Sequence, residues 1–149
     1  MQSIARFAAL GVAVLLAATV GASAQTPTPF DMKGTWKGTG EAIVDGPAMH
    51  HPPGTPAKAA GKYRLRTQAY VYKIDGQDGK RFWGTASGEN IANERLVGTL
   101  SMDGKWIYMA AAEGILDGVV VDADTIQMCY RQVTPAVAVV ACNEMKRQK

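Results

Sequence analysis

The most constraining feature of this sequence is a series of short apolar stretches, separated by turn signals, between residues 96 and 131. The turn signals are Asp103-Gly104, Glu113-Gly114 and Asp122-Ala123-Asp124. No stretch between them has the length or the 3.6-residue period of a helix. Short apolar stretches bounded by Gly and Asp are typical of strands. The segment is therefore predicted to be a meander of consecutive antiparallel strands.

The rest of the chain extends this pattern in both directions. Strands are expected at residues 35–44, 62–75, 80–88, 96–102, 105–111, 115–121, 125–133 and 137–146. About eight antiparallel strands joined mostly by tight turns predict an all-β fold, a closed up-and-down β-barrel that leaves no sheet edge exposed. A two-sheet β-sandwich is the alternative. Eight strands are also about the number at which a barrel interior holds one small ligand.

Two local features leave the direction of side chains open. A two-residue turn at Asp103-Gly104 pairs Leu100 with Ile107, whereas a three-residue turn pairs it with Trp106, and these registers put opposite faces inside. In residues 62–75 the apolar alternation changes phase near Ala69-Tyr70, which predicts a bulge or a bend there.

The N-terminus has the pattern of a secretory signal peptide over residues 1–24. One charge, Arg6, precedes an apolar run at residues 7–20, and Ala22-Ser23-Ala24 supplies the small residues of a cleavage site. Cleavage is predicted between Ala24 and Gln25. The apolar run is shorter than the roughly 20 residues of a membrane span, so a periplasmic or secreted protein with no membrane attachment is expected.

The mature chain has the length of one domain. A proline-rich, extended lead-in is expected at residues 25–33 and a single barrel domain at 34–149. Residues 45–61 are rich in Pro, Gly and Ala and show no periodicity. A long loop of this kind in a compact domain is usually functional or disordered, and it is a candidate lid over one end of the barrel.

The two cysteines, Cys129 and Cys142, are predicted to form a disulfide. A hairpin connection at residues 134–137 lies midway between them, so folding the chain there brings them opposite each other on adjacent strands. Both share the more polar face of their strands, which places the bond outside the core. Closing this loop contributes roughly 2–4 kcal/mol.

The charge distribution and the motifs argue against nucleic-acid binding and against known kinds of catalytic site. Without Arg6 the formal net charge falls from +3 to +2, with mixed signs and no basic stripe of the kind that binds nucleic acid. There is no Gly-x-Ser-x-Gly, His-Glu-x-x-His or glycine-rich phosphate loop, so neither an enzyme nor a cofactor is expected. His50 and His51 beside Met49 are a candidate for copper or zinc, but no acidic residue or cysteine is close enough in sequence to complete a metal site.

The candidate ligand-binding residues are aromatic side chains on the strands and one carboxylate. Tyrosine hydroxyls and indole N–H groups orient ligands in otherwise apolar cavities. Asp117 is in phase with Ile115 and Val119, so it is a candidate for an inward-pointing polar anchor. The set is Trp36, Tyr70, Tyr72, Trp83, Trp106, Tyr108, Asp117 and Tyr130.

The sequence Gly34-Thr35-Trp36 resembles the Gly-x-Trp motif of the calycins, which include lipocalins and avidins. The resemblance implies that the indole plugs one end of the barrel and that a basic residue near the end of the last strand, Lys146 or Arg147, packs over it. The Thr-Asp-Tyr motif of lipocalins is missing and the biotin-contacting residues of avidins do not align, so no particular ligand is implied. Exported eight-stranded lysozyme inhibitors of Gram-negative bacteria have a comparable architecture.

These features lead to an expected function. The first hypothesis is a periplasmic or secreted, non-enzymatic barrel, monomeric or homodimeric, that binds a small apolar or amphipathic molecule. The alternative is a protein-binding module, such as an inhibitor of a hydrolase, that uses the loop at residues 45–61 or one end of the barrel. An enzyme with a sequence-dispersed site is the third hypothesis.

Overall fold

The computed structural model describes residues 28–48, 58–60, 62–89 and 91–149. The predicted signal peptide and both histidines lie outside these ranges. Within them the chain forms strands and no helix. None of the described residues belongs to a helix that is long and apolar enough to span a membrane. The strands are β1 (Gly34–Asp45), β2 (Lys58–Ala60), β3 (Tyr63–Asp78), β4 (Arg81–Gly88), β5 (Ile91–Leu100), β6 (Trp106–Ala110), β7 (Ile115–Asp122), β8 (Thr125–Val133) and β9 (Ala138–Arg147).

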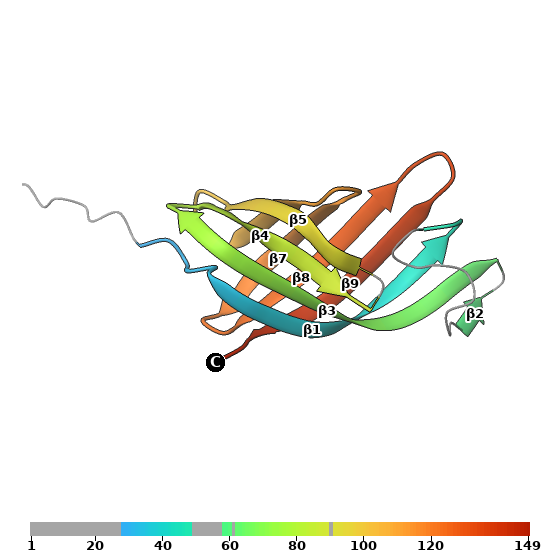
Figure 1. Ribbon diagram of the computed structural model, residues 1–149, viewed down its shortest axis with the longest axis horizontal. Coiled ribbons are helices and arrows are strands. Elements are labelled where there is room, and N and C mark those ends of the chain that lie inside the picture. Colours follow the sequence, from blue (N-terminus) through green and yellow to red (C-terminus); the bar gives the residue numbers. More distant parts are fainter. Residues whose placement is uncertain (1–27, 49–57, 61, 90) are drawn as a thin grey trace, which may run out of the picture.

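Eight of these strands close into an antiparallel barrel (Figure 1). Each strand from β3 to β8 pairs with the next along the chain, and β1 pairs with both β3 and β9. The closed ladder confirms the predicted up-and-down barrel and excludes the two-sheet sandwich. The short β2, inside the segment expected to be an irregular loop, pairs with the start of β3.

The register of the β5–β6 hairpin is the one that pairs Leu100 with Ile107. Ile107 is fully buried, whereas Trp106 and Tyr108 point outward. The buried apolar residues Ile107 and Met109 occupy the inner face of β6 and leave its aromatic residues on the outer face.

The bulge expected near Ala69-Tyr70 is not there. The pairing between β1 and β3 continues without interruption from Val44 opposite Arg64 to Gly34 opposite Ile74. The irregularity in β3 falls later, between Ile74 and Gly76. The prediction of a bulge was wrong because it assumed that polar side chains point outward, whereas Arg66 and Gln68 of β3 point into the barrel.

β5 is longer than predicted and begins where a connection was expected. It pairs with β4 as far as Ile91 but with β6 only as far as Val97. In the described part of the chain, β5 residues 91–96 therefore have no strand partner on their β6 side. The wall of the barrel is incomplete at this place.

One end of the barrel, where β1 begins and β9 ends, is closed by side chains and is called here the plugged end. Trp36 is fully buried there, and its Nε1–H donates a hydrogen bond of 2.9 Å to the Met32 carbonyl. Met32 is buried and Phe30 packs against the same core, so the end of the expected lead-in belongs to the plug. The core behind it is made of Tyr72, Ile74, Phe82, Leu96, Leu100, Ile107, Met109, Leu116, Ile126, Met128 and Met145.

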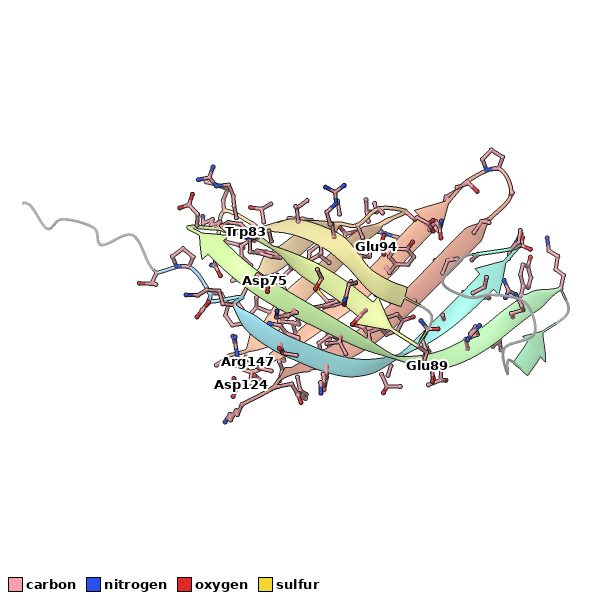
Figure 2. The ribbon with its side chains drawn as sticks, viewed as in Figure 1. Asp75, Trp83, Glu89, Glu94, Asp124 and Arg147 are labelled. Carbon is pink, nitrogen blue, oxygen red and sulfur yellow. A yellow bond between two sulfur atoms is a disulfide. The ribbon has the colours of Figure 1, made fainter. Side chains whose placement is uncertain are left out.

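Arg147 seals the plugged end. Its guanidinium carbon lies 4.2 Å from the centroid of the Trp36 ring, a cation–π contact. The same group donates hydrogen bonds of 2.6 Å and 2.5 Å to the carbonyls of Asp31 and Lys33, and its Nε lies 3.3 Å from a carboxylate oxygen of Asp124 (Figure 2). The basic residue that packs over the indole is therefore Arg147.

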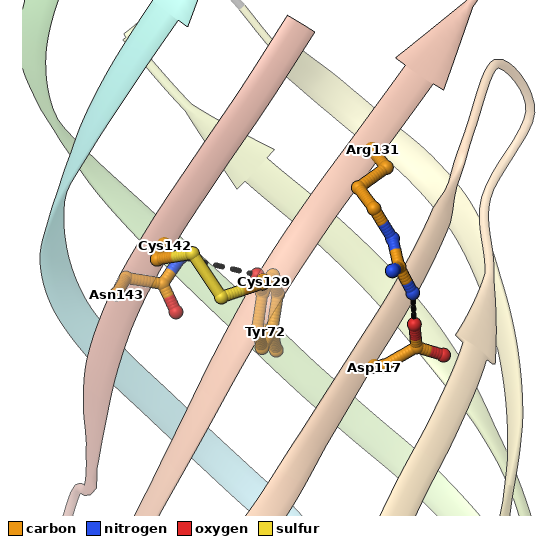
Figure 3. The surroundings of a disulfide bond; sticks show 6 residues. All are labelled: Tyr72, Asp117, Cys129, Arg131, Cys142 and Asn143. Atoms are coloured by element: carbon orange, nitrogen blue, oxygen red, sulfur yellow. Dashed lines mark hydrogen bonds and ion pairs between the residues drawn. A yellow bond between two sulfur atoms is a disulfide. The ribbon is translucent and has the colours of Figure 1, made fainter.

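The disulfide is confirmed. Cys129 of β8 and Cys142 of β9 lie directly opposite each other and are joined by an S–S bond of 2.04 Å (Figure 3). Cys142 is exposed and Cys129 is half-buried. The bond therefore lies on the outer wall, as the alternation of the two strands predicted.

Candidate ligand site

The interior of the barrel changes character away from the plugged end. Alternate residues of β3 point inward, and they begin with polar side chains before reaching Tyr70 and Tyr72. The inward polar residues of this region are called here the polar layer. They are Arg66, Gln68, Tyr70, Tyr130, Gln132 and Asn143.

Strand pairing brings the polar layer together across four strands. In one row of inward positions, Arg66 of β3 lies opposite Ala42 of β1, which lies opposite Ala141 of β9, which lies opposite Tyr130 of β8. In the row nearer the plugged end, Gln68 and Asn143 flank Gly40 in the same way. Because the residues between them are small, the polar side chains border a part of the wall that carries little side-chain volume.

The polar layer is buried yet incompletely paired. Arg66 is 5% exposed, Gln68 2% and Asn143 8%. Among the described residues no hydrogen-bond partner exists for Nε and Nη1 of Arg66, for either amide atom of Gln68, for Oδ1 of Asn143 or for the Tyr70 hydroxyl. An unpaired buried polar group costs about 1–3 kcal/mol, and more when it is charged. Such groups call for a partner from outside the chain, either water or a ligand.

Other polar atoms of this region are paired. Asn143 Nδ2 donates a 3.4 Å hydrogen bond to the Tyr72 hydroxyl (Figure 3). The Tyr130 hydroxyl donates to Gln132 Oε1 at 3.3 Å, and Gln132 Nε2 donates to Glu113 Oε2 at 3.2 Å. These contacts hold Tyr130 and Asn143 in fixed orientations at either side of the polar layer.

The tyrosine hydroxyls are neutral. Burial raises the pKa of Tyr72 to about 12. Burial is also the main cause that raises the pKa of Tyr70, with Tyr72 contributing. The pKa of Tyr130 is raised by burial and by the carboxylates of Glu94 and Glu113. At ordinary pH these groups therefore act as hydrogen-bond donors and acceptors without charge.

The polar layer lies where the barrel wall is least complete. The last residue of β4 that pairs with β3 is Gly88, opposite Tyr70, and Glu94 lies on the part of β5 that runs past the end of β6 (Figure 2). Beyond the polar layer, Val44, Ala48 and Val139 form a small apolar cluster that also contacts Tyr130.

The structure divides the predicted site residues between the two faces of the barrel. Trp36, Tyr70 and Tyr72 are buried inside and Tyr130 is partly buried there. Trp83, Trp106 and Tyr108 are on the outer face, 48%, 50% and 45% exposed, so they do not line the interior.

Asp117, the candidate inward anchor, also lies outside. It is paired with Tyr108 across the sheet and forms an ion pair with Arg131 (Figure 3). The inner face of β7 is taken instead by its neighbour Leu116, which is buried in the core. The carboxylate of Asp117 is consequently not an interior anchor.

The sequence reading missed Arg66, Gln68 and Asn143. The signal for the first two was present, since they alternate in phase with Tyr70 and Tyr72 along β3. Reading this alternation as continuous, instead of placing a bulge in it, identifies both as inward residues. Asn143 has the same signal, because it alternates with the inward Ala141 and Met145 of β9.

Two hollows lie on the outer wall. The larger, of about 1040 Å³, runs over β1, β3 and β7–β9 and contains the disulfide and the pair of Asp117 and Arg131. The second, of about 760 Å³, lies over β4–β7 beside Trp83 and Tyr108. Both present exposed apolar side chains to the solvent.

The described ranges contain no group of three His, Cys, Asp or Glu side chains placed to hold a metal ion. His50 and His51, and most of the loop expected at residues 45–61, lie outside these ranges. The hypotheses about that loop therefore stay predictions.

No protein-family model, no curated protein and no solved structure matches this chain. The function is accordingly inferred from the side chains inside and outside the barrel.

Proposed function

We propose that this protein is an exported, non-enzymatic, calycin-like barrel that binds one small amphipathic molecule, with the polar group of that molecule in the polar layer. The observation that supports this most strongly is the set of buried, unpartnered polar atoms on Arg66, Gln68 and Asn143. Nearly all buried polar groups in native proteins are paired. A ligand with complementary groups would remove a cost of about 1–3 kcal/mol for each of them.

The surroundings of the polar layer suit an amphipathic molecule. The row of inward positions that holds Arg66 and Tyr130 continues through Leu116 and Met109, which are buried and apolar. A ligand in this place would contact polar groups on one side and apolar groups on the other. Binding sites of this composition, mostly apolar with a few fixed polar groups, are typical of small-molecule carriers.

Export is supported by the N-terminal signal pattern and by the disulfide. Disulfides persist in oxidising compartments such as the periplasm and the extracellular space. The bond between Cys129 and Cys142 lies on the outer wall, where a reducing cytoplasm would have access to it. Calycin-like character is supported by Arg147 packing over Trp36 at the plugged end.

Native mass spectrometry of the mature protein, purified from a bacterial periplasm without denaturation, tests this function. We expect a reproducible added mass of a small organic molecule. The double variant Gln68→Leu with Asn143→Leu replaces two buried amides that carry unpaired atoms by apolar side chains of similar size and should lose that mass. Trp106→Ala on the outer wall is the control and should keep it. A wild-type protein that is bare under the same conditions would contradict the proposal.

A second candidate function is favoured by the outer wall. Trp83, Trp106 and Tyr108 are half exposed beside the two hollows, and Trp and Tyr are the residues that most often dominate protein interfaces. The protein would then be a binding module such as a hydrolase inhibitor. The test is inhibition of c-type lysozyme by the mature protein, with relief by Trp83→Ala and Trp106→Ala. Unchanged lysozyme activity at equimolar protein would argue against this version.

A further inference from the structure

We infer that the ligand carries an oxyanion, such as a carboxylate, which supplies the counterion that Arg66 lacks within its own chain. This inference rests on the proposed function and adds to it the charge and the orientation of the ligand. Three observations carry it: the burial of Arg66, the distribution of acidic residues along the chain and the polar groups next to the guanidinium.

The first observation is the condition of Arg66 itself. Its side chain is 95% buried, that is 5% exposed, and its Nε and Nη1 have no hydrogen-bond partner in the described part of the chain. A guanidinium stays charged at every pH that a protein tolerates. It therefore cannot relieve its burial by losing a proton, and a buried charge needs a counterion or a full set of hydrogen bonds.

The second observation is that no ion pair between described residues gives Arg66 a counterion. All 13 acidic residues lie in the described ranges, because residues 1–27, 49–57, 61 and 90 contain no Asp or Glu. Among the ion pairs that the described residues form with one another, none includes Arg66. The basic partners in these pairs are Lys62, Lys73, Arg81, Arg131, Lys146, Arg147 and Lys149. An anionic ligand would therefore supply a charge partner that these ion pairs do not give to Arg66.

The third observation is the set of groups beside the guanidinium. Gln68 is the next inward residue of β3, and positions two residues apart in a strand are about 7 Å apart, so one small molecule can contact both side chains. Gln68 Nε2 lies near the Tyr70 hydroxyl without a hydrogen bond of good geometry, so it is a further donor for the oxyanion. The unpaired Gln68 Oε1 and Asn143 Oδ1 are acceptors, so the ligand would also carry a hydroxyl or N–H group next to its anionic group.

The charges around the polar layer set the orientation. Arg66 points inward from β3, four residues before Tyr70, whereas the carboxylate of Glu113 accepts a hydrogen bond from Gln132 at the β8 side of the interior. An anionic group is attracted to the first side and repelled from the second. The oxyanion of the ligand is thus directed toward β3 and the donor group away from it.

The experiment compares four probes of similar length: hexanoate, hexanamide, hexylamine and hexyl phosphate. Their affinities for the mature protein are measured by calorimetry, and the Nε–H resonance of Arg66 is followed by NMR. Hexanoate should bind about 10- to 100-fold more tightly than hexanamide, and hexylamine most weakly, because a hydrogen bond between two charged groups is the stronger one. Only the anions should shift the Arg66 resonance. The comparison of hexanoate with hexyl phosphate then decides between a carboxylate and a phosphate.

Arg66→Gln should abolish the preference for hexanoate over hexanamide, while Arg95→Gln, which removes an exposed arginine of β5, should leave it unchanged. Equal affinity of the wild type for hexanoate and hexanamide would overturn this inference and leave the proposed function standing. Preference for hexanoate that survives Arg66→Gln would also overturn it. If no probe binds at about 10 mM and the purified protein is bare, the proposed function fails as well.

Discussion

Two arginines point into the barrel from different regions, and their surroundings are opposite. At the plugged end, Arg147 packs on Trp36, donates to the carbonyls of Asp31 and Lys33 and lies beside the carboxylate of Asp124. In the polar layer, Arg66 is more deeply buried and has neither a carboxylate nor a hydrogen bond at Nε or Nη1 within the described residues. The same side chain thus cross-links segments of the chain in one region and is buried with unpaired donors in the other.

The two arginines should therefore have different effects on the free energy of unfolding. A cation whose donors are all used holds separate segments of the chain together, so its removal should destabilise the protein. A buried cation without a partner lowers stability, and a protein retains it only where it serves another purpose. Removing Arg147 should therefore lower the free energy of unfolding, and removing Arg66 should raise it.

The largest effect is expected at the plug. Trp36→Ala should lower the free energy of unfolding by about 3–5 kcal/mol, because it opens a cavity in the core and removes the platform for Arg147. Urea denaturation followed by circular dichroism measures this. Trp106→Ala, a half-exposed tryptophan of the outer wall, is the control and should change the free energy of unfolding by less than about 1 kcal/mol. Equal losses at the two positions would show that the plug has no special role.

The disulfide tests whether the two regions unfold together. Replacing both Cys129 and Cys142 by Ala should lower the free energy of unfolding by roughly 2–4 kcal/mol. Because β8 and β9 contribute inward residues to both the core and the polar layer, we expect a single transition in the variant as in the wild type. Tryptophan fluorescence and circular dichroism recorded in one urea titration should then give coincident unfolding curves. Two separate transitions would mean that the regions are independent.

Arg147→Met should lower the free energy of unfolding by about 2–3 kcal/mol, since it removes charge-assisted hydrogen bonds to backbone carbonyls and the cation–π contact. Thermal denaturation at constant salt provides the measurement. Lys146→Met is the matched control, because Lys146 is the neighbouring cation but is exposed and pairs only with Glu144 and Thr125. A similar loss for both variants would indicate a general effect of charge.

Arg66→Met should change the free energy of unfolding in the opposite direction to Arg147→Met. Replacing a buried, unpaired charge by an apolar side chain of comparable length is expected to raise the free energy of unfolding of the ligand-free protein by about 1–3 kcal/mol. The same denaturation experiment applies, on protein shown to be bare by native mass spectrometry. A loss of stability as large as that of Arg147→Met would erase the contrast between the two arginines.

The smallest expected effect is the contribution of Tyr72 to stability, which changes only at alkaline pH. The pKa of Tyr72 is raised by burial to about 12, above the value of about 10 of an unfolded chain. Its contribution to stability is therefore complete below pH 10 and is lost as the pH rises through the folded-state pKa. At about pH 11 the wild type should lose about 1 kcal/mol relative to neutral pH that Tyr72→Phe does not lose. Tyr108→Phe on the outer wall should behave as the wild type.

Most of the fold was predictable from the turns. Gly104 adopts a φ of +76°, a conformation that suits glycine, and the Asp-Gly pair located the β5–β6 hairpin correctly. The limits of β8 agree with the predicted residues 125–133, because a regular apolar alternation ends there at turn residues. The start of β5 was missed, since residues 91–95 carry no such alternation. The three-residue β2 gave no signal because a strand that short has no measurable period.

The site was only partly predictable, for a physical reason. Alternation tells which residues share a face, and the assignment of the inner face then relies on polarity. That rule fails in a layer of polar groups that point inward, so the apolar alternation before Ala69-Tyr70 did not identify Arg66 and Gln68 as inward residues. It fails again for aromatic residues, which are favoured on both faces of a sheet, as Trp106 and Tyr108 show.

The pairing of the first long strand with the last has a consequence for the order of folding. Lys33 and Arg147, which meet at the plugged end, are 114 residues apart in the sequence. While the chain is being synthesised, each strand between β1 and β9 can pair with the one before it, but β1 gains its second neighbour only when the C-terminal strand is available. Contacts so distant in sequence form slowly. Barrel closure therefore belongs to the final step of folding, and loss of the 10 residues of β9 would leave a sheet with two open edges that is prone to aggregate.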